Sequence, residues 1–241
     1  MKLFTCLVLL AGLVNSGSTQ STYFIDSLPR TAPYQPVAKK QFVRSLILPS
    51  AAIMYGAAAL RSGTLQDWNA TVKKNTVAGI GHRTHIDDYL QYTPALAGHV
   101  LSIAGIKGKH KLFDRLMIDG IAAGFSITSV LILKQVISEK RPDGSDDRSF
   151  PSNHAATAFC SAELLREEYS DVSPWYGIAG YSVAVVTGYL RLYNNKHWFG
   201  DVLAGAGIGI VSAKLANKLF PFAKRILFGR PKALAFDLTK K

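Results

Sequence analysis

Apolar residues are concentrated in long stretches of the chain, and charged residues lie mostly in the segments between them. The stretches do not alternate apolar and polar residues as a β-strand would, and alanine, leucine and glycine are frequent in them, which favours helices. The pattern predicts an all-α fold, a bundle of about six long helices. Five of the predicted helices are uncharged: Ser45–Leu60, Tyr89–Ile106, Gly120–Leu133, Val172–Leu190 and Val202–Ala213. The sixth, Ser152–Leu164, is less apolar.

Length and hydropathy place these helices near the limit for crossing a membrane. A helix needs about 20 apolar residues to span the hydrocarbon core, and Val172–Leu190 and Tyr89–Ile106 come closest to that length. The chain has a mean hydropathy of +0.13. Its charged residues amount to 18%, below the roughly 25% of soluble domains. These features predict a membrane-embedded bundle and leave an exported soluble domain as the alternative.

The N-terminus has the pattern of a secretory signal peptide. Lys2 is followed by the apolar stretch Leu3–Val14 and then by small and polar residues, so we expect a signal peptide over residues 1–18. The apolar stretch is too short to cross a membrane, which takes about 20 residues. We expect the remaining chain to comprise a polar, proline-containing linker over residues 19–42, a helical domain over 43–222 and a basic tail over 223–241.

The balance of charge is basic, with 28 lysine and arginine residues against 16 aspartate and glutamate residues and a net charge of +12. Such an excess suits an anionic partner: nucleic acid, an acidic membrane surface or a phosphorylated substrate. Nucleic acid is disfavoured, because the basic residues gather at predicted helix ends without aromatic residues between them. Two cysteines, Cys6 and Cys160, are too few for a disulfide scaffold or a cysteine-based zinc site.

The distribution of basic residues predicts a topology. Basic residues follow Ile106 and Ala213, and in an antiparallel bundle both segments lie at the same end, which the positive-inside rule places in the cytoplasm. The opposite end, with residues 138–150 and 191–198, then faces outward. Cleavage of the signal peptide would leave residue 19 outside, and the three helices that follow would then return residues 138–150 to the cytoplasm, against this topology. The conflict disappears if the leader is retained, if the helix at 45–60 lies along the membrane surface, or if the bundle does not span the membrane.

Three short segments concentrate polar residues in this otherwise apolar chain. In the first, Lys134 ends an apolar run and Arg141 follows two helical turns later on the same side, before Pro142 stops the helix. An arginine fork and a lysine point charge at one place suit the binding of a dianion. Basic residues also occur at helix C-termini simply because they complement the helix dipole.

The second segment is Pro151-Ser152-Asn153-His154, at a predicted junction between a loop and a helix. Proline, serine and asparagine are common at helix N-termini, and the free N–H groups of such a junction form an anion site. His154 in the first turn is unusual, because the positive end of the helix dipole disfavours a charged imidazole unless an anion is bound.

The third segment contains Arg191, His197 and Asp201. On a helix, His197 and Asp201 share a face because they are four residues apart, so Asp201 can accept a hydrogen bond from one ring nitrogen. The other nitrogen is then free to act as a nucleophile, with the orienting logic of a catalytic triad. A surface histidine–aspartate pair is the alternative interpretation.

Together the three segments resemble the signature of the type-2 phosphatidic acid phosphatase superfamily. The pattern of that superfamily is K-x6-R-P, then P-S-G-H, then S-R-x5-H-x3-D. This chain has KQVISEKRP, PSNH and LRLYNNKHWFGD in the same order and with the same spacings. Asn153 replaces the glycine of the pattern, and Leu190 replaces its small or hydroxylated residue. The stretches THIDDYLQYTPA and DVSPW are similar to exported bacterial members.

The resemblance implies a helical phosphatase that needs neither a metal nor another cofactor. His197 would be the nucleophile that forms a phosphohistidine, Asp201 would orient it, and His154 would serve as acid and then as base. The implied phosphate-binding residues are Lys134, Arg141, Ser152, Asn153 and Arg191.

The sequence thus predicts a phosphoric monoester hydrolase acting on a lipid phosphomonoester or pyrophosphate. The expected partners are a lipid phosphate and a membrane, and the oligomeric state stays open. The expected location is the bacterial inner membrane with the active site facing the periplasm, or the periplasm for a soluble protein. The alternatives are an exported acid phosphatase for small phosphoesters, and a non-catalytic anion-binding membrane protein whose site Asn153 has inactivated.

A further polar cluster, residues 82–88, precedes the apolar run that begins at Tyr89. It contains two histidines and the neighbouring aspartates Asp87 and Asp88. The cluster lines the substrate entrance, or holds a metal, or is a solvated loop at an acidic helix start. The last is the simplest interpretation.

Overall fold

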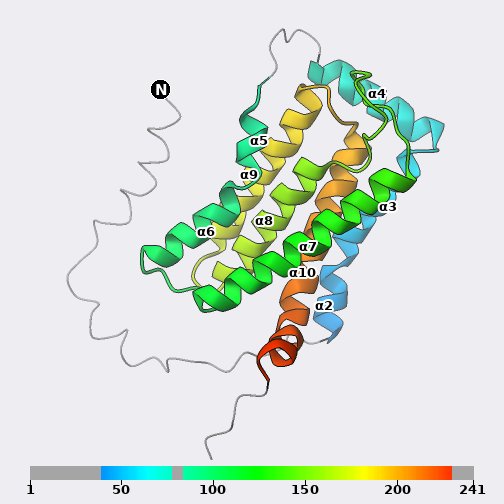
Figure 1. Cartoon of the computed structure of the whole chain (residues 1–241). Coiled ribbons are helices and arrows are strands. Elements are labelled where there is room, and N and C mark those ends of the chain that lie inside the picture. The colour runs from blue at the N-terminus through cyan, green and yellow to red at the C-terminus, as the bar shows by residue number, and fades with distance from the viewer. Residues whose placement is uncertain (1–38, 78–83, 230–241) are drawn as a thin grey trace, which may run out of the picture. The chain divides into compact units, whose positions relative to one another are not determined.

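The computed structural model describes residues 39–77 and 84–229, and every regular element in these two ranges is a helix (Figure 1). The predicted all-α class is confirmed. The predicted signal peptide, residues 19–38 of the predicted linker and the end of the basic tail lie outside the described residues. In chain order the helices are α2 (Lys39–Ser45), α3 (Ile47–Ala59), α4 (Gly63–Val77), α5 (Ile86–Leu90), α6 (Thr93–Ile103), α7 (Leu112–Val136), α8 (Asn153–Tyr169), α9 (Pro174–Tyr193) and α10 (Phe199–Phe228).

The six predicted helices correspond to α3, α6, α7, α8, α9 and α10. The run from Tyr89 is divided, because α5 ends at Leu90 and α6 begins at Thr93 with Pro94 in its first turn, where proline is tolerated. The sequence did not predict α4, since most of its positions are polar and it has no apolar run. The domain limits at residues 43 and 222 stay predictions.

Helix α8 lies at the centre of the bundle, in contact with α6, α7, α9 and α10 (Figure 1). Its alanines Ala155, Ala158 and Ala162 are fully buried, and small side chains of this kind let neighbouring helices approach closely. In α10, a Cβ on Gly209 would lie 2.1 Å from the carbonyl oxygen of Ala156, so only glycine fits there. This packing fixes the beginning of α8 against the N-terminal half of α10.

Within the described residues, three helical segments are long and apolar enough to cross a membrane: Lys40–Ala59, which takes in α2 and α3, Leu112–Val136 and Phe199–Phe228. The two runs that came closest to spanning length in the sequence are not among them, because α6 has only 11 residues, whereas α9 has 20 residues but is not apolar enough. Large apolar side chains are also exposed on the bundle, with Leu48 80% and Ile103 81% exposed. Such a surface suits lipid rather than water, so the bundle is embedded in a membrane.

Candidate active site

The three polar segments lie at one end of the bundle. Helices α7 and α9 end there, and α8 and α10 begin there, because successive helices run in alternating directions (Figure 1). The Ser152 N–H donates to the Asp201 carbonyl oxygen over 3.0 Å. Arg141 Nη1 lies 3.5 Å from His197 Nε2. The structure therefore brings the first, second and third segments together.

His197 and Asp201 form a buried pair, but not on one helix. Helix α10 begins at Phe199 with Trp198 as its N-cap, so His197 lies in the preceding loop and the predicted shared helical face is wrong. His197 Nδ1 lies 3.5 Å from Asp201 Oδ2, longer than an ordinary hydrogen bond. The same Oδ2 accepts from the Trp198 N–H at 2.8 Å and from the Ser149 hydroxyl at 2.5 Å. These two donors fix the carboxylate in the first turn of α10.

The surroundings of His197 keep its imidazole neutral. Burial lowers the pKa of His197 to about 4; the nearby carboxylate of Asp201 opposes this, and the charges of Arg191 and Arg141 add to it. A neutral imidazole keeps a lone pair on one nitrogen at neutral pH. Since Nδ1 faces Asp201, the lone pair belongs on Nε2, beside the guanidinium of Arg141.

Ser152 and His154 lie at the N-terminus of α8, at the junction that the sequence predicted. Ser152 is the N-cap, and its Oγ accepts from the Ala155 N–H over 3.4 Å. Asn153 and His154 are the first two residues of the helix. His154 Nε2 lies 2.8 Å from Oδ1 of Asp88 on α5, so a carboxylate from another helix orients this ring.

Two of the predicted phosphate-binding cations border this region. Lys134, in the last turn of α7, donates from Nζ to the carbonyl oxygen of Arg148 over 2.6 Å. Arg191, in the last turn of α9, forms an ion pair with Asp87. The Nε of Arg191 is buried without a hydrogen-bond partner among the described residues. That donor is open to a ligand oxygen.

Arg141, the third predicted cation, does not lie on α7. The helix ends at Val136, so the prediction that it continues to Pro142 is wrong. Residues 137–152 form a loop that makes its own backbone hydrogen bonds, among them one from the Arg141 N–H to the Asp146 carbonyl oxygen over 2.9 Å. Arg141 Nε donates to the Asp146 carboxylate over 2.7 Å. This folded loop, rather than helical periodicity, carries Arg141 to the site.

Glu139 was not predicted as a member of the site. It lies in the same loop, forms a side-chain hydrogen bond with Asp201, and has its Oε2 buried without a partner among the described residues. Burial, this hydrogen bond and the charge of Asp201 raise the pKa of Glu139 to about 9. Glu139 is therefore protonated at neutral pH and is the donor to Asp201. Glu139 occupies a variable position of the first motif, so the sequence did not indicate this contact.

Asp87 was noticed in the sequence only as part of a polar cluster. It is fully buried and bonds to Arg191 as well as to Asn194 Nδ2, the latter at 3.1 Å. An aspartate ahead of an apolar run is compatible with a solvated helix start, and nothing in the sequence indicates its partners in α9. The solvated interpretation is wrong for Asp87.

Helix α4 supports the site from outside the three segments. Asn69 Oδ1 accepts from the Gly200 N–H over 3.1 Å. Lys73 Nζ donates to the Pro142 carbonyl oxygen over 2.8 Å and lies 5.3 Å from the centre of the Trp198 ring. The helix therefore links the loop after α7 to the beginning of α10.

Asp87, Asp88 and His154 place ligand atoms within 4.8 Å of one another, which is close enough to hold a metal ion. Both oxygens of Asp87 already bond to other side chains, Oδ2 to Arg191 and Oδ1 to Asn194. The Arg191 guanidinium also lies 3.9 Å from Asp88, where it repels a cation. We therefore assign these carboxylates to the arginine and the histidine.

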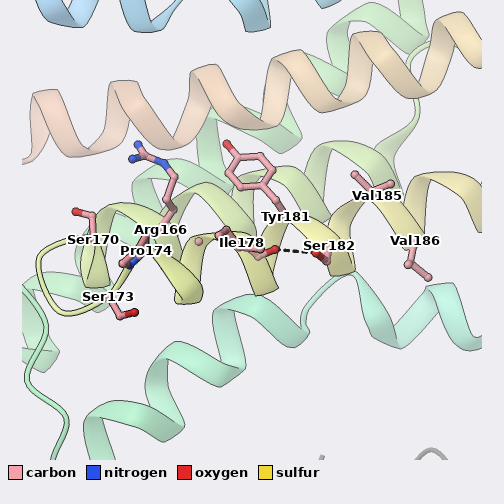
Figure 2. A pocket seen from close by; sticks show the side chains of 10 residues that line it. Arg166, Ser170, Ser173, Pro174, Ile178, Tyr181, Ser182, Val185 and Val186 are labelled. Carbon is pink, nitrogen blue, oxygen red and sulfur yellow. Dashed lines mark hydrogen bonds between the residues drawn. The ribbon is translucent and has the colours of Figure 1, made fainter. Parts of the chain in front are cut away.

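A large groove lies apart from these residues, on α8 and α9 (Figure 2). Its volume is about 760 Å³, and its lining includes Arg166, Tyr181 and Val185. The predicted site residues do not line it. A smaller cavity of about 240 Å³ borders the site, lined in part by Asn69, Glu139 and Trp198. Proximity to the histidines, rather than cavity size, therefore locates the candidate active site.

A buried histidine–aspartate pair, a second histidine at a helix N-terminus and three cations thus meet at one end of an all-α bundle, an arrangement suited to phosphoryl transfer. Residues 116–225, which contain all three polar segments, match the family model of the PAP2 superfamily. The chain belongs to the PAP2 superfamily, and the resemblance seen in the sequence is confirmed.

Named relatives include both a sequence and solved structures. The chain is 37% identical over 187 residues to a lipid A 1-phosphatase of Porphyromonas gingivalis, an alignment that covers 77% of this chain and 40% of that protein. The chain thus spans about two fifths of the length of this relative. Aquifex aeolicus LpxE has a TM-score of 0.47 and 22% identity, over 63% of this chain and 95% of that one. The first transmembrane PAP2-type phosphatidylglycerolphosphate phosphatase from Bacillus subtilis has a TM-score of 0.48 and 23% identity, over 76% and 99%.

Proposed function

We propose that the protein is a metal-independent phosphatase that hydrolyses a lipid phosphomonoester or pyrophosphate through a phosphohistidine on His197. The observation that carries the proposal is the state of His197: buried, neutral, backed by Asp201 and faced by Arg141. A neutral imidazole oriented by a carboxylate is a nucleophile. A cation beside it attracts the phosphate and stabilises the charge of the transition state.

Three cations would bind the phosphate. Arg141 lies beside the nucleophile, and Arg191 has a buried Nε without a partner among the described residues. Lys134 now donates to a backbone carbonyl oxygen, a neutral partner that an anionic phosphate oxygen can replace. The first N–H groups of α8, at Asn153 and His154, add donors at the positive end of the helix dipole.

In the first step, His197 Nε2 attacks phosphorus while the bond to the leaving oxygen breaks. His154 gives its proton to that oxygen, so the leaving group departs as an alcohol. Asp201 accepts the hydrogen bond of Nδ1–H and stabilises the positive ring of the phosphohistidine. The 3.5 Å between Nδ1 and Asp201 Oδ2 shortens as this charge develops.

In the second step, water attacks the phosphohistidine. His154, now neutral, takes a proton from the water as the new phosphorus–oxygen bond forms and the nitrogen–phosphorus bond breaks. Inorganic phosphate leaves, and His197 and His154 return to their starting states. His154 thus gives one proton to the leaving oxygen and recovers one from water, so the protons of the hydrolysis balance.

A lipid is the substrate class that best fits the rest of the molecule. The site lies at one end of a bundle whose sides expose large apolar residues, so a substrate anchored in the membrane reaches it along the surface. The relative that is 37% identical over 187 residues is a lipid A 1-phosphatase. Whether this chain acts on the same lipid is part of the proposal.

We also propose an inner-membrane location with the site facing the periplasm. Basic residues gather at the end of the bundle opposite the site, in the connection between α6 and α7 and in the C-terminal half of α10, and the positive-inside rule places such a cluster in the cytoplasm. In the described part of the chain these residues are Lys107, Lys109, Lys111, Lys218, Lys224 and Arg225.

Trapping of the intermediate tests the proposed chemistry. Protein mixed with a phosphate-labelled short-chain lipid phosphate in the presence of a chelator, then quenched, should retain label that is stable in alkali and labile in acid. His197→Ala should retain none. His99→Ala is the matched control, because His99 also faces a carboxylate, at 3.0 Å from Asp119, outside the site. Label retained by His197→Ala would contradict the proposal, and turnover of small phosphoesters alone would favour the acid phosphatase alternative.

A further inference from the structure

Asp88 has no role in the mechanism above, yet it contacts one of the catalytic histidines. Its Oδ1 lies 2.8 Å from His154 Nε2 and 3.9 Å from Arg191 Nη1. Building on the proposed function, we propose that Asp88 is a positioning residue. Its carboxylate holds the ring of His154 and keeps the protonated form of that ring available for a poor leaving group.

Asp88 is held in place by the anchoring of the short helix α5. The neighbouring Asp87 bonds to Arg191 and to Asn194, both from the end of α9. Asn194 also binds the backbone of Thr84 in both directions, accepting from its N–H at 3.0 Å and donating to its carbonyl oxygen at 2.8 Å. The beginning of α5 is thus tied to α9, so the Asp88 carboxylate is presented to His154 before any substrate binds.

The contact determines which nitrogen of His154 reacts. A carboxylate accepts hydrogen bonds, so Nε2 carries a proton in both the neutral and the charged ring. Within residues 39–77 and 84–229, no group hydrogen-bonds to Nδ1. Nδ1 is therefore the atom that gives a proton to the leaving oxygen and later takes one from water, while Nε2–H stays on Asp88.

The charged groups facing His154 act in opposite directions. The pKa of His154 is lowered overall, because burial and the charge of Arg191 on α9 outweigh the hydrogen bond to Asp88 and the charges of Asp87 and Asp88, which raise it. Asp88 is itself an anion, because its hydrogen bond to His154 lowers its pKa against the effect of burial. The exposed ring of His85 also faces Asp88, at 3.4 Å. Removing the charge of Asp88 therefore leaves less of His154 in the acid form at neutral pH.

The inference predicts an effect that depends on the leaving group. An alkoxide leaves only when it takes a proton as the phosphorus–oxygen bond breaks, so a lipid phosphate needs the acid form of His154. A nitrophenolate is stable without a proton and leaves whether or not His154 is charged. Loss of Asp88 should therefore impair the first reaction and spare the second.

The experiment uses Asp88→Asn, which preserves shape and removes the charge. We would measure kcat/KM, which covers the steps up to cleavage of the phosphorus–oxygen bond, for aryl phosphates from acidic nitrophenols to phenol and for a lipid phosphate in mixed micelles. We expect a loss of about 10- to 100-fold on the lipid phosphate and less than about threefold on the most acidic phenol. The alkaline limb of the pH profile on the lipid phosphate should also move to lower pH.

Two further variants complete the design. Asp88→Glu keeps the charge and should keep a leaving-group dependence close to that of the native protein. Asp171→Asn removes an exposed aspartate paired with Lys109 over 3.3 Å at the opposite end of the bundle, and should change nothing. A loss by one factor on every substrate, or no loss on the lipid phosphate, would overturn the role of Asp88 and leave the proposed function intact. Full activity of His197→Ala on the same substrates would instead contradict the proposed function.

Discussion

The hydroxyl of Ser149 donates a 2.5 Å hydrogen bond to Oδ2 of Asp201, the oxygen nearest the ring of His197. Ser149 comes from the loop after α7, whereas Asp201 lies in the first turn of α10. Both side chains are buried, so the bond is protected from water. The loop that carries Arg141 therefore also orients the carboxylate behind the nucleophile.

Ser149→Ala should lower kcat by about tenfold with little change in KM, because it removes one hydrogen bond to a buried charge, worth about 1.5 kcal/mol, without touching the phosphate. Steady-state kinetics on a lipid phosphate in mixed micelles measures both constants. Ser182→Ala is the control, since the Ser182 hydroxyl donates to the Ile178 carbonyl oxygen over 2.8 Å on the exposed face of α9, away from the site (Figure 2). A rise in KM at constant kcat would show that Ser149 acts on substrate binding instead.

Glu139 should add a second limit on activity, at a more alkaline pH than the one set by loss of the acid form of His154. Its pKa of about 9 means that it donates to Asp201 at neutral pH and becomes a second carboxylate beside Asp201 as the pH rises through 9. We expect Glu139→Gln, which keeps a donor but cannot ionise, to be about as active as the native protein at pH 7 and to lose less activity above pH 9. The pH profiles of the two proteins make the comparison. Identical alkaline limbs would exclude Glu139 as their cause.

Asn153 should not inactivate the site, although the superfamily pattern has glycine at this position. Asn153 is exposed at the first position of α8, and its backbone is not among the residues with positive φ. Since the backbone does not require glycine there, Asn153→Gly should change kcat/KM on a lipid phosphate by less than about threefold. Activity that appears only in this variant would instead support the non-catalytic alternative.

The contact between α8 and α10 should be sensitive to a single methyl group. In Gly209→Ala the new Cβ would meet the Ala156 carbonyl oxygen at 2.1 Å, and overpacking of this kind costs about 1–3 kcal/mol. Thermal unfolding in detergent should show a lower Tm. Gly120→Ala in α7 is the matched control, because nothing lies within 4 Å of the added Cβ and alanine favours a helix by about 1 kcal/mol. Equal Tm values for the two variants would contradict the tight contact.

The sequence predicted the helices whose apolar runs are long, because burial and lipid contact both select for such runs. It failed at α4, whose interactions with the site are made by Asn69 and Lys73, polar residues that do not form an apolar stripe. It also failed at the end of α7. A spacing of seven residues between Lys134 and Arg141 matches two helical turns, but the loop around Asp146 competes successfully for the backbone hydrogen bonds.

At the site, the spacing of the motif residues predicted that they come together. The sequence did not predict which other side chains they contact. His197 and Asp201 were predicted as a pair on a helix, and they do face each other, although a loop and a helix start bring them together. Glu139 comes from a variable position of the first segment, and Asp88 comes from outside all three segments. Contacts of this kind depend on how the helices pack, which a local pattern does not contain.

The most direct measurement is phosphate release from a lipid phosphate in mixed micelles, with a chelator present, by native protein, His197→Ala and His99→Ala. We predict chelator-resistant release by the native protein and by His99→Ala, and a loss of at least about 1,000-fold in His197→Ala. Release by His197→Ala at the native rate would contradict the assignment of His197 as the nucleophile.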